Sequence, residues 1–240
     1  MSTATPITLV LLPGMDGTGA LFAPFLRALP GWITPLVVAY PTDRPLDYQG
    51  HLEIVMAALP TDQPFVLLGE SFSGPLALLA AAQNPPGLRG VILCATFVTW
   101  PLLIPPVFAR MAVSLGVFRL KSTRLFQRLV FGVAGELRQL ASGALARVTP
   151  AVLAARARAV LGVDCSEELR TCPVPVLALV ADHDRIVARR NADLLQQIRP
   201  DTTILHFNAP HLILQCATIE ACTQICLFMR AMIDPPTLFH

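Results

Sequence analysis

The sequence predicts an α/β fold, with a mostly parallel sheet of about six or more strands and helices on both of its faces. Short, almost continuously apolar runs alternate with helical patterns along much of the chain. Such runs are typical of parallel strands that are covered on both faces. The chain has 240 residues, of which 54% are hydrophobic and 14% charged, so it can form one large core, and disorder is disfavoured.

The elements of this fold can be assigned in order along the chain. Each predicted strand is a short apolar run, and each predicted helix is a longer segment with apolar residues at helical spacing. Strands are expected at residues 7–12, 35–40, 65–68, 90–95, 174–180 and 203–207. Helices are expected at residues 21–29, 48–59, 73–82, 189–198 and 216–232.

Residues 100–166 interrupt the alternation, because their pattern predicts several helices with no strand between them. We interpret residues 1–99 and 167–240 as the core and residues 100–166 as a helical lid inserted over one edge of the sheet. The longest uncharged stretch, residues 91–109, contains three prolines, which favours a strand and a loop over a membrane span.

The most informative motif is the run Gly69-Glu70-Ser71-Phe72-Ser73, which joins an apolar strand to an apolar helix. A strand that turns sharply into a helix holds the middle side chain in a strained, exposed position and requires small neighbours. The start of the helix also presents unpaired N–H groups to an anion that forms there. These conditions suit a nucleophilic serine at position 71.

A serine nucleophile needs a base that takes its proton and a carboxylate that orients the base. Of the five histidines, only His211 lies in a loop after the last predicted strand. Asp184 follows the preceding strand, and Asp182 is the runner-up, with the capping of a turn as its alternative role. Because Ser71, Asp184 and His211 all follow strands, they are expected at the same edge of the sheet.

The run around Ser71 resembles the G-x-S-x-G nucleophile elbow of the α/β-hydrolase superfamily, with Ser73 at the last glycine position and Gly74 one residue later. The chain order of Ser71, Asp184 and His211 is the order of that superfamily, and Asp184 begins a run similar to its D-x-x-V pattern. The resemblance implies that these three residues form a catalytic triad.

Acyl transfer also requires N–H donors for the oxyanion, and we expect them at Phe72 and Met15. Met15 lies in the run Pro-Gly-Met-Asp-Gly-Thr-Gly at residues 13–19, which resembles the superfamily's His-Gly loop with Pro13 in place of histidine. With Gly-Glu-Ser, this loop looks like that of phytyl-ester-type plastid acyltransferases, whereas the chain length and lid position resemble pimeloyl–acyl-carrier-protein methyl esterases of biotin synthesis. Phosphate-loop patterns and metal-ligand spacings are missing from the sequence, so no nucleotide, metal or other cofactor is expected.

The predicted lid is basic, with nine arginines and lysines against two acidic residues and a net charge of +7, compared with +2 for the chain. Such asymmetry attracts acidic partners. Nucleic acid is disfavoured as a partner, because the overall charge is modest and aromatic residues are not interleaved with the basic ones. An acidic acyl carrier protein is expected to dock on the lid. Solvated arginines on ordinary amphipathic helices, and adsorption to an anionic membrane, are the alternatives. The proposed docking residues are Arg119, Lys121, Arg124, Arg128 and Arg138.

The resemblance implies a serine esterase that forms an acyl-enzyme on Ser71, with a carrier-bound acyl methyl ester as the preferred substrate. Acyl transfer to an alcohol and thioester hydrolysis would use the same residues, and a catalytically silent binding protein is the alternative from another class. The six cysteines include no C-x-x-C pair and lie mostly in apolar patterns, which favours free thiols and a reducing cytoplasm.

Overall fold

The computed structural model describes residues 7–120 and 135–233. These residues form a six-stranded sheet in the order β2-β1-β3-β4-β5-β6, in which every neighbouring pair is parallel. The predicted fold class is therefore confirmed. The strands are β1 (Ile7–Leu12), β2 (Ile33–Val37), β3 (Phe65–Glu70), β4 (Leu88–Cys94), β5 (Val176–Ala181) and β6 (Thr203–Phe207).

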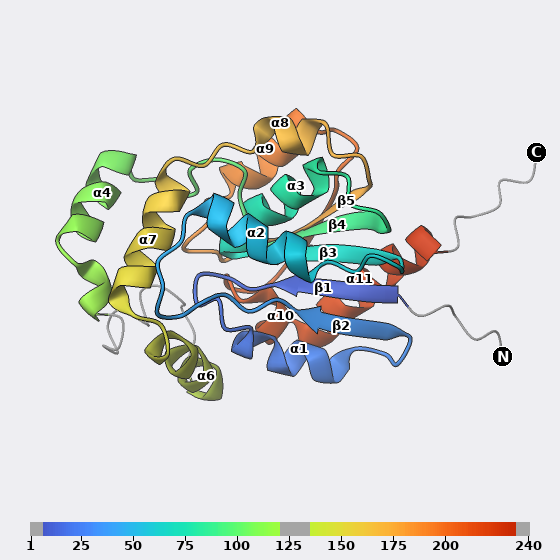
Figure 1. Cartoon of the computed structure of the whole chain (residues 1–240), viewed down its shortest axis with the longest axis horizontal. Helices are drawn as coiled ribbons and strands as arrows, with labels where there is room; N and C mark the ends of the chain where they lie inside the picture. Colours follow the sequence, from blue (N-terminus) through green and yellow to red (C-terminus); the bar gives the residue numbers. More distant parts are fainter. Residues whose placement is uncertain (1–6, 121–134, 234–240) are drawn as a thin grey trace, which may run out of the picture.

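Helices cover both faces of the sheet (Figure 1). Alternate strand residues supply the two cores, so that Leu9 and Val66 are buried on one face and Val10 and Leu67 on the other. The first face is covered by η1 (Ala20–Phe22), α1 (Ala23–Ala28), α10 (Ile213–Cys216) and α11 (Thr218–Ile233). The second is covered by α2 (Tyr48–Ala58), α3 (Gly74–Ala82), α8 (Ser166–Arg170) and α9 (Arg190–Ile198).

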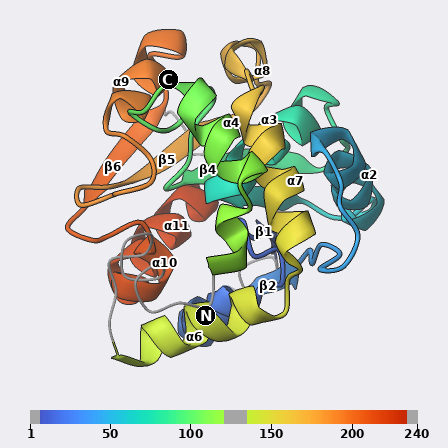
Figure 2. The ribbon, with the colours of Figure 1, turned by 90° about the vertical axis from the view of Figure 1, so that its left-hand side faces the viewer.

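In the segment between β4 and β5, every element among the described residues is a helix, as predicted. Before α8 it contains α4 (Pro106–Ser114), η3 (Val117–Leu120), α6 (Gly135–Ala146) and α7 (Pro150–Leu161). These elements lie beyond the end of the sheet to which the strands point, and α4 and α7 stand in front of that end in Figure 2. We call this segment the insert, and the boundaries proposed for it at residues 100 and 166 stay a prediction.

Most element boundaries differ from the prediction by one to three residues, and two of the differences have local reasons. β2 begins at Ile33, two residues early, because Pro35 is tolerated inside an edge strand that pairs only with β1. The helix predicted at residues 216–232 is divided at Ala217, where φ −114° and ψ 40° leave the helical region. In the described ranges, no helix is both long and apolar enough to cross a membrane.

Candidate active site

Ser71 lies in the predicted sharp turn between β3 and α3. Its φ of 52° is in the left-handed region, where a non-glycine residue is strained. Glycine is required on either side: a Cβ at Gly69 would lie 2.4 Å from the carbonyl oxygen of Ser73, and one at Gly74 would lie 2.1 Å from Oγ1 of Thr96. The Thr96 hydroxyl donates a hydrogen bond to the carbonyl of Ser71 and holds the strained residue in place. No pattern in the sequence indicated this role of Thr96.

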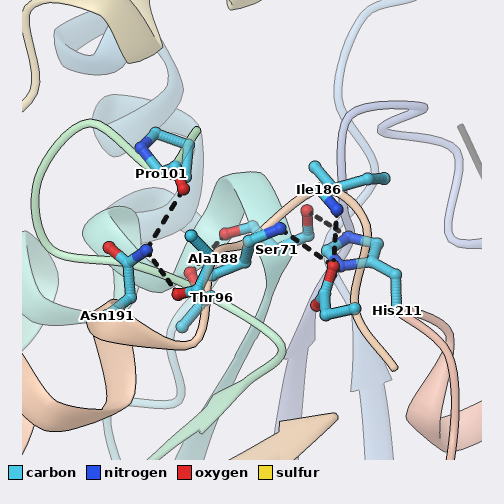
Figure 3. Close-up of polar contacts among 9 residues, drawn as sticks. Ser71, Thr96, Pro101, Ile186, Ala188, Asn191 and His211 are labelled. Atoms are coloured by element: carbon cyan, nitrogen blue, oxygen red, sulfur yellow. Dashed lines mark hydrogen bonds and ion pairs between the residues drawn. The ribbon is translucent and has the colours of Figure 1, made fainter. Parts of the chain in front are cut away.

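The structure brings Ser71, His211 and Asp184 together in one hydrogen-bonded chain. Nε2 of His211 lies 2.8 Å from Oγ of Ser71, and Nδ1 lies 2.7 Å from Oδ2 of Asp184. Figure 3 shows the side chains of Ser71 and His211 pointing toward each other. The other oxygen of Asp184 accepts the backbone N–H groups of Ile186 and Val187, both at 2.8 Å. Because the carboxylate engages Nδ1–H, Nε2 is left to accept the serine proton.

The environment of His211 favours its protonated form. Burial alone lowers the pKa of a histidine, but the charge of Asp184 and its hydrogen bond outweigh burial, so the pKa of His211 is raised above its ordinary value of 6.5. The side chains of His211 and Asp184 are only 5% and 6% exposed. A base of this kind acts in its neutral form, which predominates only above the raised pKa.

Asp182, the runner-up for the carboxylate, has a different partner. Its Oδ1 lies 3.0 Å from Nδ1 of His206, and both side chains are substantially exposed. His183 contacts Asn208 at 2.8 Å. Within the described ranges, no three His, Cys, Asp or Glu side chains are grouped as metal ligands would be.

The loop that carries Asp184 is fixed to the beginning of the insert. The buried Asn191 donates from Nδ2 to the carbonyl of Pro101 at 3.2 Å and to that of Ala188 at 2.8 Å (Figure 3). The N–H of Ala188 also donates to Pro101, at 3.0 Å. These contacts hold the carboxylate loop against residue 101, and nothing in the sequence pattern predicted them.

Met15 and Phe72, the two predicted oxyanion donors, both lie beside Ser71 and line the same cavity. A Cβ at Gly14 would lie 3.6 Å from Cβ of Ser71, which shows how closely the loop after β1 approaches the serine. In the part of the chain that the structure describes, the N–H of Met15 has no hydrogen-bond acceptor. This geometry leaves that N–H available to an anion, and its role as an oxyanion donor stays a prediction.

Ser73 bonds directly to the loop after β1. Its hydroxyl donates to the carbonyl of Pro13 and lies 2.8 Å from the hydroxyl of Tyr40. Because the Ser73 proton is used on Pro13, the Tyr40 hydroxyl is the donor between the two hydroxyls. The two residues that depart from the superfamily pattern, Ser73 and Pro13, are therefore bonding partners.

The serine opens onto a cavity of about 410 Å³ that lies between the sheet edge and the insert. Its lining is largely apolar, and two buried acids, Asp16 and Glu70, contribute to it. Burial raises the pKa of Glu70 to about 7, although its Oε1 accepts a hydrogen bond from Gln215 at 3.1 Å. The apolar residues from α4 and α7 are Ala109, Ala112, Val113, Leu153, Ala157, Val160 and Leu161.

The basic residues of the insert do not form one uniform surface. Arg119 is exposed and Arg138 is partly exposed, whereas Lys121, Arg124 and Arg128 lie outside the described residues. The interpretation of the insert's basic residues as solvated or partner-binding is wrong for Arg156, because its side chain is fully buried.

The helical spacing contained the signal for the burial of Arg156. This residue shares the buried stripe of α7 with Val152, Leu153 and Val160, at intervals of three and four residues.

The parallel sheet, the strained turn at Ser71 and the convergence of the loops after β3, β5 and β6 define an α/β-hydrolase fold. The chain belongs to the serine aminopeptidase S33 family, whose model matches residues 42–213. The predicted superfamily and the assignment of the chain as a hydrolase are confirmed at this level.

Solved structures and one curated relative extend this comparison. An esterase from Exiguobacterium antarcticum and a bromoperoxidase from Bacillus anthracis each superimpose with a TM-score of 0.80 at 15% identity, covering 95% of this chain and 93% of theirs. Identity this low shows a shared fold. The chloroplastic phytyl ester synthase 1 of Arabidopsis thaliana is 37% identical over 83 residues, which cover 32% of this chain and only 12% of that protein.

Proposed function

We propose that this chain hydrolyses carboxylic esters through an acyl-enzyme on Ser71. The observation that carries the proposal is the hydrogen-bonded chain from Ser71 through His211 to Asp184, at the wall of an apolar cavity. Nε2 of His211 takes the hydroxyl proton while Oγ of Ser71 attacks the ester carbonyl carbon. Asp184 orients the imidazole and stabilises its charged form.

The tetrahedral intermediate places its oxyanion between the N–H groups of Phe72 and Met15. Loss of one such donor typically costs about 3 kcal/mol of transition-state stabilisation. The intermediate collapses as His211 returns the proton to the departing alcohol. His211 then deprotonates a water molecule, which attacks the acyl carbon, releases the carboxylic acid and restores Ser71.

The cavity supports a neutral, lipophilic acyl group as the bound part of the substrate. Its walls are largely apolar, which favours an uncharged acyl chain beside the serine. The finer form of the proposal is a methyl ester of an acyl chain attached to an acidic carrier protein, as in the biotin-synthesis esterases that the sequence resembles. The six free cysteines support a reducing cytoplasm as its location.

Carrier docking is tested separately from ester cleavage. Replacing the exposed Arg119 and the partly exposed Arg138 together with glutamate should lower kcat/KM for the carrier-bound methyl ester by about tenfold and spare a free p-nitrophenyl ester. An equal loss on both substrates would contradict docking at these two positions.

Acyl transfer to an alcohol is the second candidate activity. The stretch shared with phytyl ester synthase 1 favours it, and an apolar cavity that limits water at the acyl-enzyme is a physical reason for it. With a long-chain alcohol added, transfer gives an ester product, whereas hydrolysis gives only the free acid. Predominance of the ester product would replace the hydrolase proposal.

A panel of free esters, carrier-bound methyl esters, acyl thioesters and amino-acid p-nitroanilides tests the proposed activity. We expect turnover of esters that is lost in Ser71→Ala and retained in Ser114→Ala, which removes an exposed hydroxyl from α4. Equal rates for wild type and Ser71→Ala would remove the proposed nucleophile. Hydrolysis of anilides without esters would assign an amide substrate, and binding without turnover of any compound would assign the silent alternative.

A further inference from the structure

The insert sends one cationic side chain into the core, directly behind the loop after β1. The guanidinium of Arg156, on α7, is fully buried. It donates to the carbonyl oxygens of Met15 at 2.8 Å and Pro41 at 2.9 Å, and to Nε2 of His51 at 3.3 Å. Its Cζ also lies 5.7 Å from the centre of the Tyr40 ring. Arg156 is thus held by donor contacts to three separate parts of the core.

This cation does not serve as half of a close ion pair. In the described part of the chain, no carboxylate oxygen lies within 4.0 Å of the Arg156 guanidinium. The buried acid that acts electrostatically on Arg156 is Asp16, which accepts from Thr18 through Oδ1 and whose Oδ2 has no hydrogen-bond partner among the described residues. Burying an arginine in this way is costly, and an apolar side chain of similar length would fill the same space. An apolar side chain would lack the directed N–H donors of the Arg156 guanidinium.

Those donors act on Met15, the residue whose N–H is the second predicted oxyanion donor. The carbonyl of Pro13 is held by Ser73, from the turn after β3, and the carbonyl of Met15 is held by Arg156, from the insert. The N–H of Met15 lies between these two anchored carbonyls in the chain. Gly17 completes the fit, because a Cβ there would lie 2.6 Å from the nearer guanidinium nitrogen.

We propose that Arg156 is a positioning residue that holds the loop at residues 13–17 so that the Met15 N–H points to the oxyanion, and that this part of the site is completed by the insert. The inference rests on the proposed function, since it assigns a role to an oxyanion donor. It also couples the substrate cavity to catalysis, because α7 lines that cavity through Ala157 and Val160 while Arg156 holds the loop.

The test compares Arg156→Met, which keeps length and loses every donor, with Arg156→Lys and with Arg158→Met. Arg158 is exposed on the same helix and provides a matched change of charge. On a short p-nitrophenyl ester, Arg156→Met should lower kcat by roughly 10- to 100-fold with KM within about threefold, because the loss falls on the transition state. Arg156→Lys should lose less, and Arg158→Met should match wild type.

Two further readouts separate positioning from a general loss of structure. The inhibition constant of an aliphatic trifluoromethyl ketone, whose serine adduct carries an oxyanion, should rise in Arg156→Met by the factor that kcat falls. Amide hydrogen exchange at Gly17 and Thr18, whose N–H groups bond within this loop, should be faster in Arg156→Met than in Arg158→Met.

The outcomes distinguish this inference from the proposed function. If a folded Arg156→Met keeps wild-type kcat, ketone affinity and loop exchange, the positioning role is wrong even when Ser71→Ala abolishes turnover. If wild type and Ser71→Ala are equally inactive, the proposed function fails. In that case, amide exchange at Gly17 and Thr18 that is the same in Arg156→Met as in wild type would still contradict the positioning role of Arg156. If Arg156→Met does not fold, Arg156→Lys decides: slower turnover with faster loop exchange supports the role, and wild-type values for both overturn it.

Discussion

At the scale of single residues, the informative positions are those where this chain departs from its superfamily pattern. Ser73 stands at the expected glycine and Pro13 at the expected histidine, and the Ser73 hydroxyl bonds to the Pro13 carbonyl. The turn has glycines at position 69 of the pattern and at position 74, one residue past it, and an added Cβ at either would collide with neighbouring atoms. The extra hydroxyl therefore joins the turn at the serine to the opposite loop without disturbing the turn.

The first prediction concerns Ser73→Gly, which restores the pattern residue. It should lower kcat by about three- to tenfold and the free energy of unfolding by about 1–3 kcal/mol, because the Pro13 carbonyl and the buried Tyr40 hydroxyl lose a partner. Enzyme kinetics and urea denaturation measure the two effects. Tyr40→Phe is the control, since it removes only the outer hydrogen bond and should retain kcat. A fully active and equally stable Ser73→Gly protein would show that the hydrogen bond between Ser73 and Pro13 has no role.

The second prediction concerns pH. Activity requires neutral His211, and its pKa is raised by Asp184, so kcat/KM should fall as the pH drops through a value above 6.5. Asp184→Asn removes the charge that raises this pKa, so the acid limb of the profile should move to lower pH while kcat falls by up to about 10⁴-fold. Asp182→Asn, which touches only the His206 pair, should leave both the limb and the rate unchanged. An acid limb that stays in place in Asp184→Asn would contradict the proposed pairing.

At the scale of elements, α7 serves both the core and the cavity. The stripe that contains Leu153 and Val160 packs inward, and Ala157 borders the space beside the serine. An insert helix of this kind determines how much acyl chain fits, because its small residues leave room that larger ones would fill.

The third prediction concerns Ala157, which lines the cavity from α7. Ala157→Phe should reduce the cavity and lower kcat/KM for octanoyl esters by at least about tenfold, with acetyl esters within about threefold of wild type. Ala151→Phe places the same bulk on an exposed position of the same helix and should change neither rate. A uniform loss across chain lengths would mean that the acyl group does not lie along α7.

At the scale of the whole molecule, the sheet edge could be predicted from sequence because it follows from strand order. The apolar runs predicted the observed bounds of β1 and β6. Because the strands are parallel, the loops after β3, β5 and β6 meet at one edge of the sheet. The hydrogen bonds that hold the loops at this edge could not be predicted in the same way. Ser73 reaches Pro13 across 60 residues, and Arg156 reaches Met15 across 141 residues, so both depend on how the finished elements pack. The helical spacing carried a signal for the burial of Arg156, which the sequence interpretation missed, and it carried none for the carbonyls that Arg156 contacts.

In the proposed reaction, Ser71 becomes acylated when His211 removes its proton. Intact-protein mass spectrometry after brief mixing with a p-nitrophenyl ester tests this most directly. We expect a chain heavier by one acyl group, with the label on the peptide that contains Ser71 and absent from Ser71→Ala and His211→Ala. Turnover of the ester with the acyl group on another residue, or with the same labelling in Ser71→Ala, would contradict it.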